Sequence, residues 1–322
     1  ITFNGVTLSP LNALSFPIVL KTSNVFLGTG KYVIKYLEDT PYLEVNKNHS
    51  NFSGEWNNQI ALFDMAGSTS EAYAFKSNKI SVYKDDLTDG KYENLSSKTV
   101  SIPTNNLVYA GLNMRWGGSI TSVAWIRRVI NIGINRLDIS AASFLGQCEP
   151  TTMPFKPDFY KLSGQELIST KGDLNRAITI LENNGYDKFT DEGYRTDGVN
   201  TLRLSILVCN NNPYKKSVAE ALQKSLATLG IKATISVKNK ADYLKALEEG
   251  FYEIYIGEIE LPADYNLSEF FTAEGQVNYG ISEKASVNYE NFKKGNLNMT
   301  EFVESFNTDV PFAPLFFRKS VV

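Results

Sequence analysis

Five consecutive segments decide the fold of this chain: LRLSILVC (residues 202–209), YKKSVAEALQKSLATL (214–229), GIKATISV (230–237), ADYLKALEEG (241–250) and FYEIYIG (251–257). The first, third and fifth have the length and composition of β-strands, and the second and fourth repeat apolar residues at helical spacing. Strands that alternate with helices predict an α/β domain whose sheet lies between helices. The run ends in Pro262-Ala263-Asp264-Tyr265-Asn266, a loop directly after the last strand.

The composition excludes several classes of function. The chain has 322 residues, 43% of them hydrophobic, which is enough for two domains with buried cores. Its 32 Lys and Arg residues nearly balance its 35 Asp and Glu residues, so no basic surface for nucleic acid is expected. No apolar run approaches the roughly 20 residues that a transmembrane helix needs.

Cysteine and histidine are too scarce for most site chemistry. Cys148 and Cys209 form neither a Cys-x-x-Cys pair nor a disulfide framework. The single histidine, His49, excludes a histidine-rich metal site and makes a Ser-His-Asp triad untenable. We therefore predict no catalytic residues, no metal ligands and no cofactor.

Two motifs resemble ligand-binding loops but lack essential positions. Gly28-Thr29-Gly30-Lys31-Tyr32 has neither the third glycine of a dinucleotide fingerprint nor the ending of a phosphate-binding loop, and it precedes a strand. The acidic segment 191–198 lacks the ligand order of an EF-hand. We interpret the first as a turn that opens a strand and the second as a solvated turn.

Local patterns predict the remaining elements. These are a hairpin from residues 32–37 and 42–45, strands at 79–83 and 107–113, helices at 122–133, 174–183 and 301–307, and an extended segment at 310–317. Asp173 and Thr300 are placed to cap the second and third of these helices. Trp116 lies in a loop between a strand and a helix, where pocket residues are common.

Six short segments are similar to sequence motifs of one protein family. Gly28-Thr29-Gly30-Lys31-Tyr32 is similar to a Gly-Thr-Gly-Pro-Tyr strand entry, with Lys31 in place of proline. The other five segments are 109–113 (YAGLN), 132–136 (IGINR), 173–186 (DLNRAITILENNGY), 219–233 (AEALQKSLATLGIKA) and 310–315 (VPFAPL). In this order they resemble the extracellular solute-binding proteins of bacterial ABC importers, the family that includes oligopeptide-, dipeptide- and nickel-binding proteins.

The resemblance implies an α/β fold of the two-lobed periplasmic-binding-protein type, class II, in which hinge closure encloses a ligand. It begins partway into the family's sequence, so we expect an N-terminally truncated fragment whose first lobe is incomplete. Residues 1–112 would form the β-rich part of the first lobe, and residues 311–322 would cross back to it. Residues 113–310 would form the second, α/β lobe.

The same resemblance suggests ligand-binding residues. Ala263-Asp264-Tyr265 is similar to the Ala-Asp-Tyr of peptide-binding members, whose aspartate pairs with the α-ammonium group of the peptide. A charged amine in a closed cleft needs such a partner. Those members place a tryptophan shortly before the aspartate, and residues 258–262 contain none. The sequence therefore does not fix the identity of the ligand. We expect Asp264 to anchor the ligand, with Tyr109, Asn113 and Trp116 near the cleft; the alternative is that Asp264 only caps residues 267–271.

The implied function is the ligand-binding component of a bacterial ABC importer, which captures oligopeptides or dipeptides and delivers them to the permease subunits in the membrane. We expect a non-enzymatic monomer without a nucleic-acid partner, located outside the cell as a surface lipoprotein or a periplasmic protein. The alternatives are a carrier of another solute on the same fold, such as an oligosaccharide or a metal chelate, and the sensor domain of a transcriptional regulator.

Overall fold

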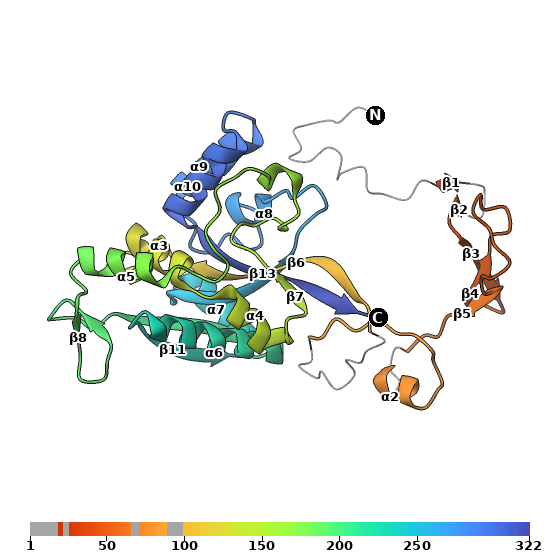
Figure 1. Cartoon of the computed structure of the whole chain (residues 1–322), viewed down its shortest axis with the longest axis horizontal. Coiled ribbons are helices and arrows are strands. Elements are labelled where there is room, and N and C mark those ends of the chain that lie inside the picture. The colour runs from red at the N-terminus through yellow and green to blue at the C-terminus, as the bar shows by residue number, and fades with distance from the viewer. Residues whose placement is uncertain (1–18, 22–25, 66–70, 89–98) are drawn as a thin grey trace. The chain divides into compact units, whose positions relative to one another are not determined.

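The chain divides into two units, one formed within residues 11–83 and the other from residue 84 onwards. The computed structural model describes residues 19–21, 26–65, 71–88 and 99–322 (Figure 1). The parts of the predicted first lobe at residues 1–18, 22–25, 66–70 and 89–98 lie outside the described residues.

The smaller unit contains antiparallel strands. β1 (Val19–Lys21) pairs with β2 (Phe26–Gly28), and β3 (Tyr32–Leu37), β4 (Thr40–Val45) and β5 (Gln59–Ala61) form a three-stranded sheet. The turn between β3 and β4 has positive φ at both Glu38 and Asp39, as type I′ hairpin turns require. The predicted hairpin is therefore confirmed.

A short helix, α2 (Glu71–Lys76), ends the regular structure of this unit. The predicted strand at 79–83 is wrong, because this segment is irregular. The backbone N–H groups of Lys79 and Ile80 turn back to the carbonyl of Ala74, 2.9 and 3.4 Å away, and so satisfy the end of α2.

The larger unit is built on a six-stranded mixed sheet with the order β11-β10-β12-β6-β13-β7. Its strands are β6 (Ser101–Leu112), β7 (Cys148–Pro150), β10 (Arg203–Cys209), β11 (Lys232–Lys238), β12 (Ile254–Glu260) and β13 (Phe312–Val321). β10 is parallel to β11 and β12, whereas β6 is antiparallel to β12 and β13. β6 and β13 run side by side through the middle of this unit (Figure 1).

Alternating side chains on these strands form two cores, one on each face of the sheet. On β6, Val108, Ala110 and Leu112 point into one core, and Leu107 and Tyr109 point into the other. The first face is covered by α3 (Ala124–Gly133), α4 (Arg136–Phe144), α5 (Leu174–Asn183) and α6 (Pro213–Thr228). The second face is covered by α7 (Lys240–Glu249), α8 (Ser268–Phe271), α9 (Glu283–Lys293) and α10 (Met299–Asp309).

The predicted α/β order of residues 202–257 is confirmed, although β12 begins three residues later than expected. Asp173 caps α5 as predicted, because its side chain accepts a hydrogen bond from the backbone N–H of Arg176 at 2.9 Å. The predicted cap at Thr300 is wrong. Asn298 caps α10 instead and forms a capping box with Glu301, which places Thr300 inside the helix. The helices α4 and α9 were not predicted.

The division between the units falls between residues 83 and 84, upstream of the lobe boundary that we place at residue 112. Strand β6 ends at that predicted boundary, yet it pairs with β12 of the predicted second lobe and with β13 of the returning segment. The two-lobe assignment itself remains a prediction.

Candidate ligand-binding site

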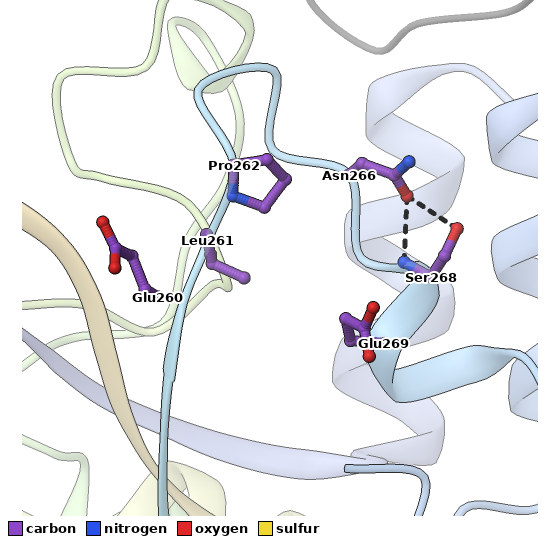
Figure 2. A pocket seen from close by; sticks show the side chains of 6 residues that line it. All are labelled: Glu260, Leu261, Pro262, Asn266, Ser268 and Glu269. Carbon is purple, nitrogen blue, oxygen red and sulfur yellow. Dashed lines mark hydrogen bonds between the residues drawn. The ribbon is translucent and has the colours of Figure 1, made fainter. Parts of the chain in front are cut away.

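A pocket of about 400 Å³ lies beyond the carboxyl end of β12, where the chain turns towards α8 (Figure 2). It is lined by Glu260, Leu261, Pro262, Asn266, Ser268 and Glu269. β12 lies beside the parallel strand β10, and the helices after β10 and β11 cover opposite faces of the sheet. In open α/β sheets, ligands bind outside the carboxyl ends of strands where such a reversal occurs.

Short polar side chains fix the loop that borders the pocket. The backbone N–H of Tyr265 donates to the carbonyl of Pro262 at 2.9 Å and closes a turn around Asp264. Oδ1 of Asp264 accepts from the backbone N–H of Asn266 at 3.1 Å. Oδ1 of Asn266 in turn accepts from the N–H and the hydroxyl of Ser268, at 3.0 and 2.6 Å (Figure 2). Asp, Asn and Ser readily hold turns in this way.

Helix α9 supports the same loop from outside the pocket. The Tyr289 hydroxyl accepts from the backbone N–H of Leu267 at 2.8 Å and donates to Oδ1 of Asn266 at 2.9 Å. Nζ of Lys293 donates to the hydroxyl of Ser268 at 3.1 Å. Burial raises the pKa of Tyr289 to about 12, so this hydroxyl keeps its proton at neutral pH.

Tyr265 holds an unusual backbone conformation beside the pocket. Its φ is +57°, although its side chain is only 6% exposed. The ring packs against Phe159, with centroids 4.7 Å apart, and edge-on against Phe155 at 5.7 Å. Burial, followed by the nearby carboxylate of Asp158, raises the pKa of the Tyr265 hydroxyl to about 12.

The pocket is acidic. Its lining includes the carboxylates of Glu260 and Glu269 and no Lys or Arg side chain. Glu260 is exposed, and Oε2 of Glu269 accepts from the backbone N–H of Gln276 at 2.9 Å. Asp264 is half-buried on the turn between Pro262 and Asn266, both of which line the pocket. The two lining carboxylates outnumber the one ammonium group that approaches the lining, that of Lys293 on Ser268, so the site carries a net negative charge and favours a cationic group.

Glu258, two residues before the end of β12, is held by internal partners. It accepts hydrogen bonds from Nε of Arg318 at 2.5 Å and from Nδ2 of Asn106 at 3.2 Å, and the Tyr214 hydroxyl also donates to it. Burial, followed by the charge of Glu258, raises the pKa of Tyr214. The ion pair between Glu258 and Arg318 neutralises both charges inside the protein.

Tyr109 lies inside the core on the second face of the sheet. It is fully buried, and its ring contacts those of Tyr255, Phe270 and Phe312 at centroid distances of 5.7, 5.0 and 5.4 Å. Its hydroxyl is 3.3 Å from that of Tyr255. Burial raises the pKa of Tyr109, which therefore stays neutral.

Asn113 tethers the loop that follows β6. Its Nδ2 donates to the carbonyls of Gly250 and Tyr252 at 2.9 and 3.1 Å. Its Oδ1 accepts from the backbone N–H groups of Arg115 and Trp116 at 3.2 and 3.1 Å. These four hydrogen bonds engage both ends of the buried amide.

Trp116 is 41% exposed, and its ring lies edge-on to that of Phe251 at 6.4 Å. The register of the sheet separates Trp116 and Asn113 from Asp264. Leu112 pairs with Ile254 at the start of β12, and Asn106 pairs with Glu260 at its end. The seven residue-to-residue steps from 106 to 113 span about 24 Å in an extended strand. The structure therefore does not bring the four predicted residues together, and only Asp264 lies beside the pocket.

The sequence interpretation did not single out Asn266, Ser268 or Tyr289. A local signal was present for the first two, because Asp264, Asn266 and Ser268 alternate as turn-forming residues do. Tyr289 comes from a helix that was not predicted.

The described residues contain no group of three or more His, Cys, Asp and Glu side chains placed to hold a metal ion. Within the same ranges, none of the helices combines the length and the apolar character needed to span a bilayer.

The chain belongs to the bacterial extracellular solute-binding proteins, family 5, whose model for the middle region matches residues 17–278. None of the curated protein sequences matches it significantly. The predicted membership and the predicted α/β fold of the periplasmic-binding-protein type are thus confirmed.

Solved structures with a similar fold include three from different bacteria. NikA from Brucella suis in complex with Fe(III)-EDTA is 14% identical with a TM-score of 0.62, and the match covers 93% of this chain and 65% of NikA. AppA from Bacillus subtilis in complex with a nonapeptide is 12% identical with a TM-score of 0.61, covering 91% and 62%. The nickel ABC transporter structure from Bacillus halodurans is 13% identical with a TM-score of 0.69, covering 94% and 66%. The chain therefore spans less than two thirds of the length of each.

Proposed function

We propose that this protein binds peptides for a bacterial ABC importer and holds the peptide amine at Asp264. The family is one of solute-binding proteins, which supports a binding role without catalysis. Peptides would be held through their backbone in β-strand fashion, a mode that tolerates varied side chains.

The observation that carries the proposal is the place of Asp264, a half-buried residue on a fixed turn whose two ends, Pro262 and Asn266, line an acidic pocket. A protonated amine placed there gains a charge-assisted hydrogen bond, which is about twice as strong as a neutral one. The nonapeptide complex of AppA supports a peptide as the ligand class. The Fe(III)-EDTA complex of NikA supports a metal chelate as the competing class.

The proposed setting follows from the family. The protein would act outside the cell, at the surface or in the periplasm, as a monomer that delivers its ligand to membrane permease subunits. We still expect Tyr109, Asn113 and Trp116 near the cleft. Their contacts with other residues of this chain also favour roles in packing and loop structure.

A thermal-shift screen of the whole protein tests the proposal. The ligands are a library of dipeptides to pentapeptides, each also in N-acetylated form, together with Ni(II)–histidine and Fe(III)-EDTA. A peptide at about 100 times its Kd adds about 2.7 kcal/mol of stability by mass action. For a unit of this size, that raises Tm by about 5–10 °C. A library that gives no shift, or a response to the chelates alone, contradicts the peptide assignment.

The Asp264→Asn variant tests the anchor residue. Asparagine keeps an oxygen that can accept from the N–H of Asn266, so the turn is preserved while the charge is lost. We expect about a tenfold or greater loss of affinity for peptides with a free amine, and little change for N-acetylated ones. The matched control is Asp138→Asn, which removes the same charge from an exposed residue of α4. Equal affinity in Asp264→Asn and wild type excludes Asp264 as the anchor.

A further inference from the structure

We infer that Tyr265 is a positioning residue, whose packed ring holds the backbone conformation that directs the Asp264 carboxylate to the ligand amine. This inference rests on the proposed function, because it assigns a role to the residue next to the proposed anchor. It concerns a residue that does not itself line the pocket.

The backbone of Tyr265 is strained. Its φ of +57° lies in the left-handed region, where Gly is favoured and Asn and Asp are tolerated. A bulky aromatic residue adopts this region only when the surrounding structure imposes it, and such strain clusters at ligand-binding positions. A glycine or asparagine would fit the turn with less strain, so the choice of tyrosine points to the side chain.

The ring of Tyr265 is clamped by a separate segment of the chain. Phe155 and Phe159, which contact it, follow β7 in sequence and lie in the same core. This segment is itself fixed, because the hydroxyl of Thr151 donates to the carbonyls of Met153 and Phe155 at 2.8 and 2.9 Å. The clamp therefore ties the loop beside the pocket to a rigid part of the larger unit.

The conformation of Tyr265 decides where the Asp264 carboxylate lies. One hydrogen bond spans this residue, because the N–H of Asn266 donates to Oδ1 of Asp264. The N–H of Tyr265 itself donates to the carbonyl of Pro262 and closes the preceding turn. A return of φ to the common negative range would swing the Asn266 N–H away from Oδ1. Asp264 would then keep its charge but lose its fixed direction, and a charge-assisted bond requires that direction.

The test compares two affinities for each variant of the whole protein. The ligands are the tightest-binding peptide of the library and its N-acetylated form, measured by isothermal titration calorimetry. A residue that only stabilises the fold lowers both affinities alike, whereas a residue that orients Asp264 changes their ratio.

Tyr265→Leu removes the aromatic ring that is clamped, and we expect it to reduce the ratio about tenfold, as the loss of a charge-assisted bond does. Tyr265→Phe keeps the ring and should retain the wild-type ratio. Phe159→Leu loosens the clamp while Tyr265 stays in place, and it should lower the ratio in the same direction. Phe306→Leu removes a ring from the same core, and because its ring neighbours are Phe302 and Phe312 and not the clamp residues, it should reduce Tm without changing the ratio.

The outcomes separate this inference from the proposed function. A wild-type protein that binds both forms of the peptide equally overturns the role of Asp264 and the inference with it. The inference alone is overturned if the wild-type protein prefers the free amine and a folded Tyr265→Leu variant keeps that preference. The role of Asp264 then stands. If Tyr265→Leu does not fold, an unchanged ratio in Phe159→Leu overturns it. Combining Tyr265→Leu with Asp264→Asn should add no further loss, because both act on one interaction.

Discussion

Replacing Gly111 with alanine should destabilise the larger unit, because the added methyl group has no space. Gly111 on β6 lies directly opposite Tyr255 on β12. A Cβ atom at position 111 would be 2.0 Å from Cε1 of Tyr255 and 2.3 Å from its Cζ. Cβ atoms in proteins essentially never approach other atoms within 3.0 Å, so the tyrosine ring would have to move.

The surroundings of the ring set the size of the effect. Tyr255 is 2% exposed, and its ring lies edge-on to Tyr109 and Tyr252 at 5.7 and 5.2 Å. Overpacking a core costs about 1–3 kcal/mol, and a ring confined in this way belongs near the upper value of about 3 kcal/mol. Each kcal/mol lowers the Tm of a unit of this size by about 2–4 °C, so we expect a decrease of about 6–12 °C.

Thermal unfolding followed by circular dichroism measures this change. Gly117→Ala is the matched control, because a Cβ at that position meets no atom within 4 Å. Tyr255→Leu in the Gly111→Ala background should recover part of the loss, since the two side chains compete for one space. A Gly111→Ala variant whose Tm stays within about 2 °C of wild type would refute the reasoning, because it would imply a cost below about 1 kcal/mol.

Three further predictions use other buried groups. Arg136→Met should cost about 3–5 kcal/mol in urea unfolding, because it leaves the carbonyls of Pro314 and Asn131 without the donor that they have in the fully buried guanidinium; a cost below about 1 kcal/mol contradicts this. Burial raises the pKa of Tyr265 and Tyr289 from 10.0 to about 12, so the folded state retains these protons more strongly than the unfolded state. The resulting stabilisation is complete below pH 10 and should be lost as pH rises through about 12, as phenolate absorbance and denaturation at stepped pH can show. Asn113→Ala should cost about 2–3 kcal/mol in urea unfolding by breaking buried hydrogen bonds, and a cost below about 1 kcal/mol contradicts this; the peptide affinity of the folded variant tests the predicted place of Asn113 near the ligand.

The elements that the sequence predicted correctly are those whose local pattern carries the packing information. β10 shows this, because Leu204, Ile206 and Val208 alternate into one core. Helix α9 was missed because its contribution to the core is sparse. Of its eleven residues, only Ala285, Tyr289 and Phe292 are buried, and polar residues surround them.

The site could be predicted only in part, because the local sequence pattern of a strand does not determine its direction relative to its neighbours in the sheet. Tyr109, Asn113 and Trp116 were expected near Asp264, which requires the carboxyl ends of β6 and β12 to lie together. The two strands are antiparallel, so the end of β6 lies at the start of β12. The clamp on Tyr265 was equally hidden, since Phe155 and Phe159 are about a hundred residues away in sequence.

The interior place of β13 has a consequence for how the protein is made. This strand comes from residues 312–321, yet it separates β6 from β7 and pairs with both. A ribosome must therefore finish these residues before the sheet can close, and every nascent chain passes through a stage in which one edge of β6 is open. Pairing between such distant segments is slow and leaves strand edges exposed to aggregation. Loss of a few residues from this strand should therefore impair folding itself.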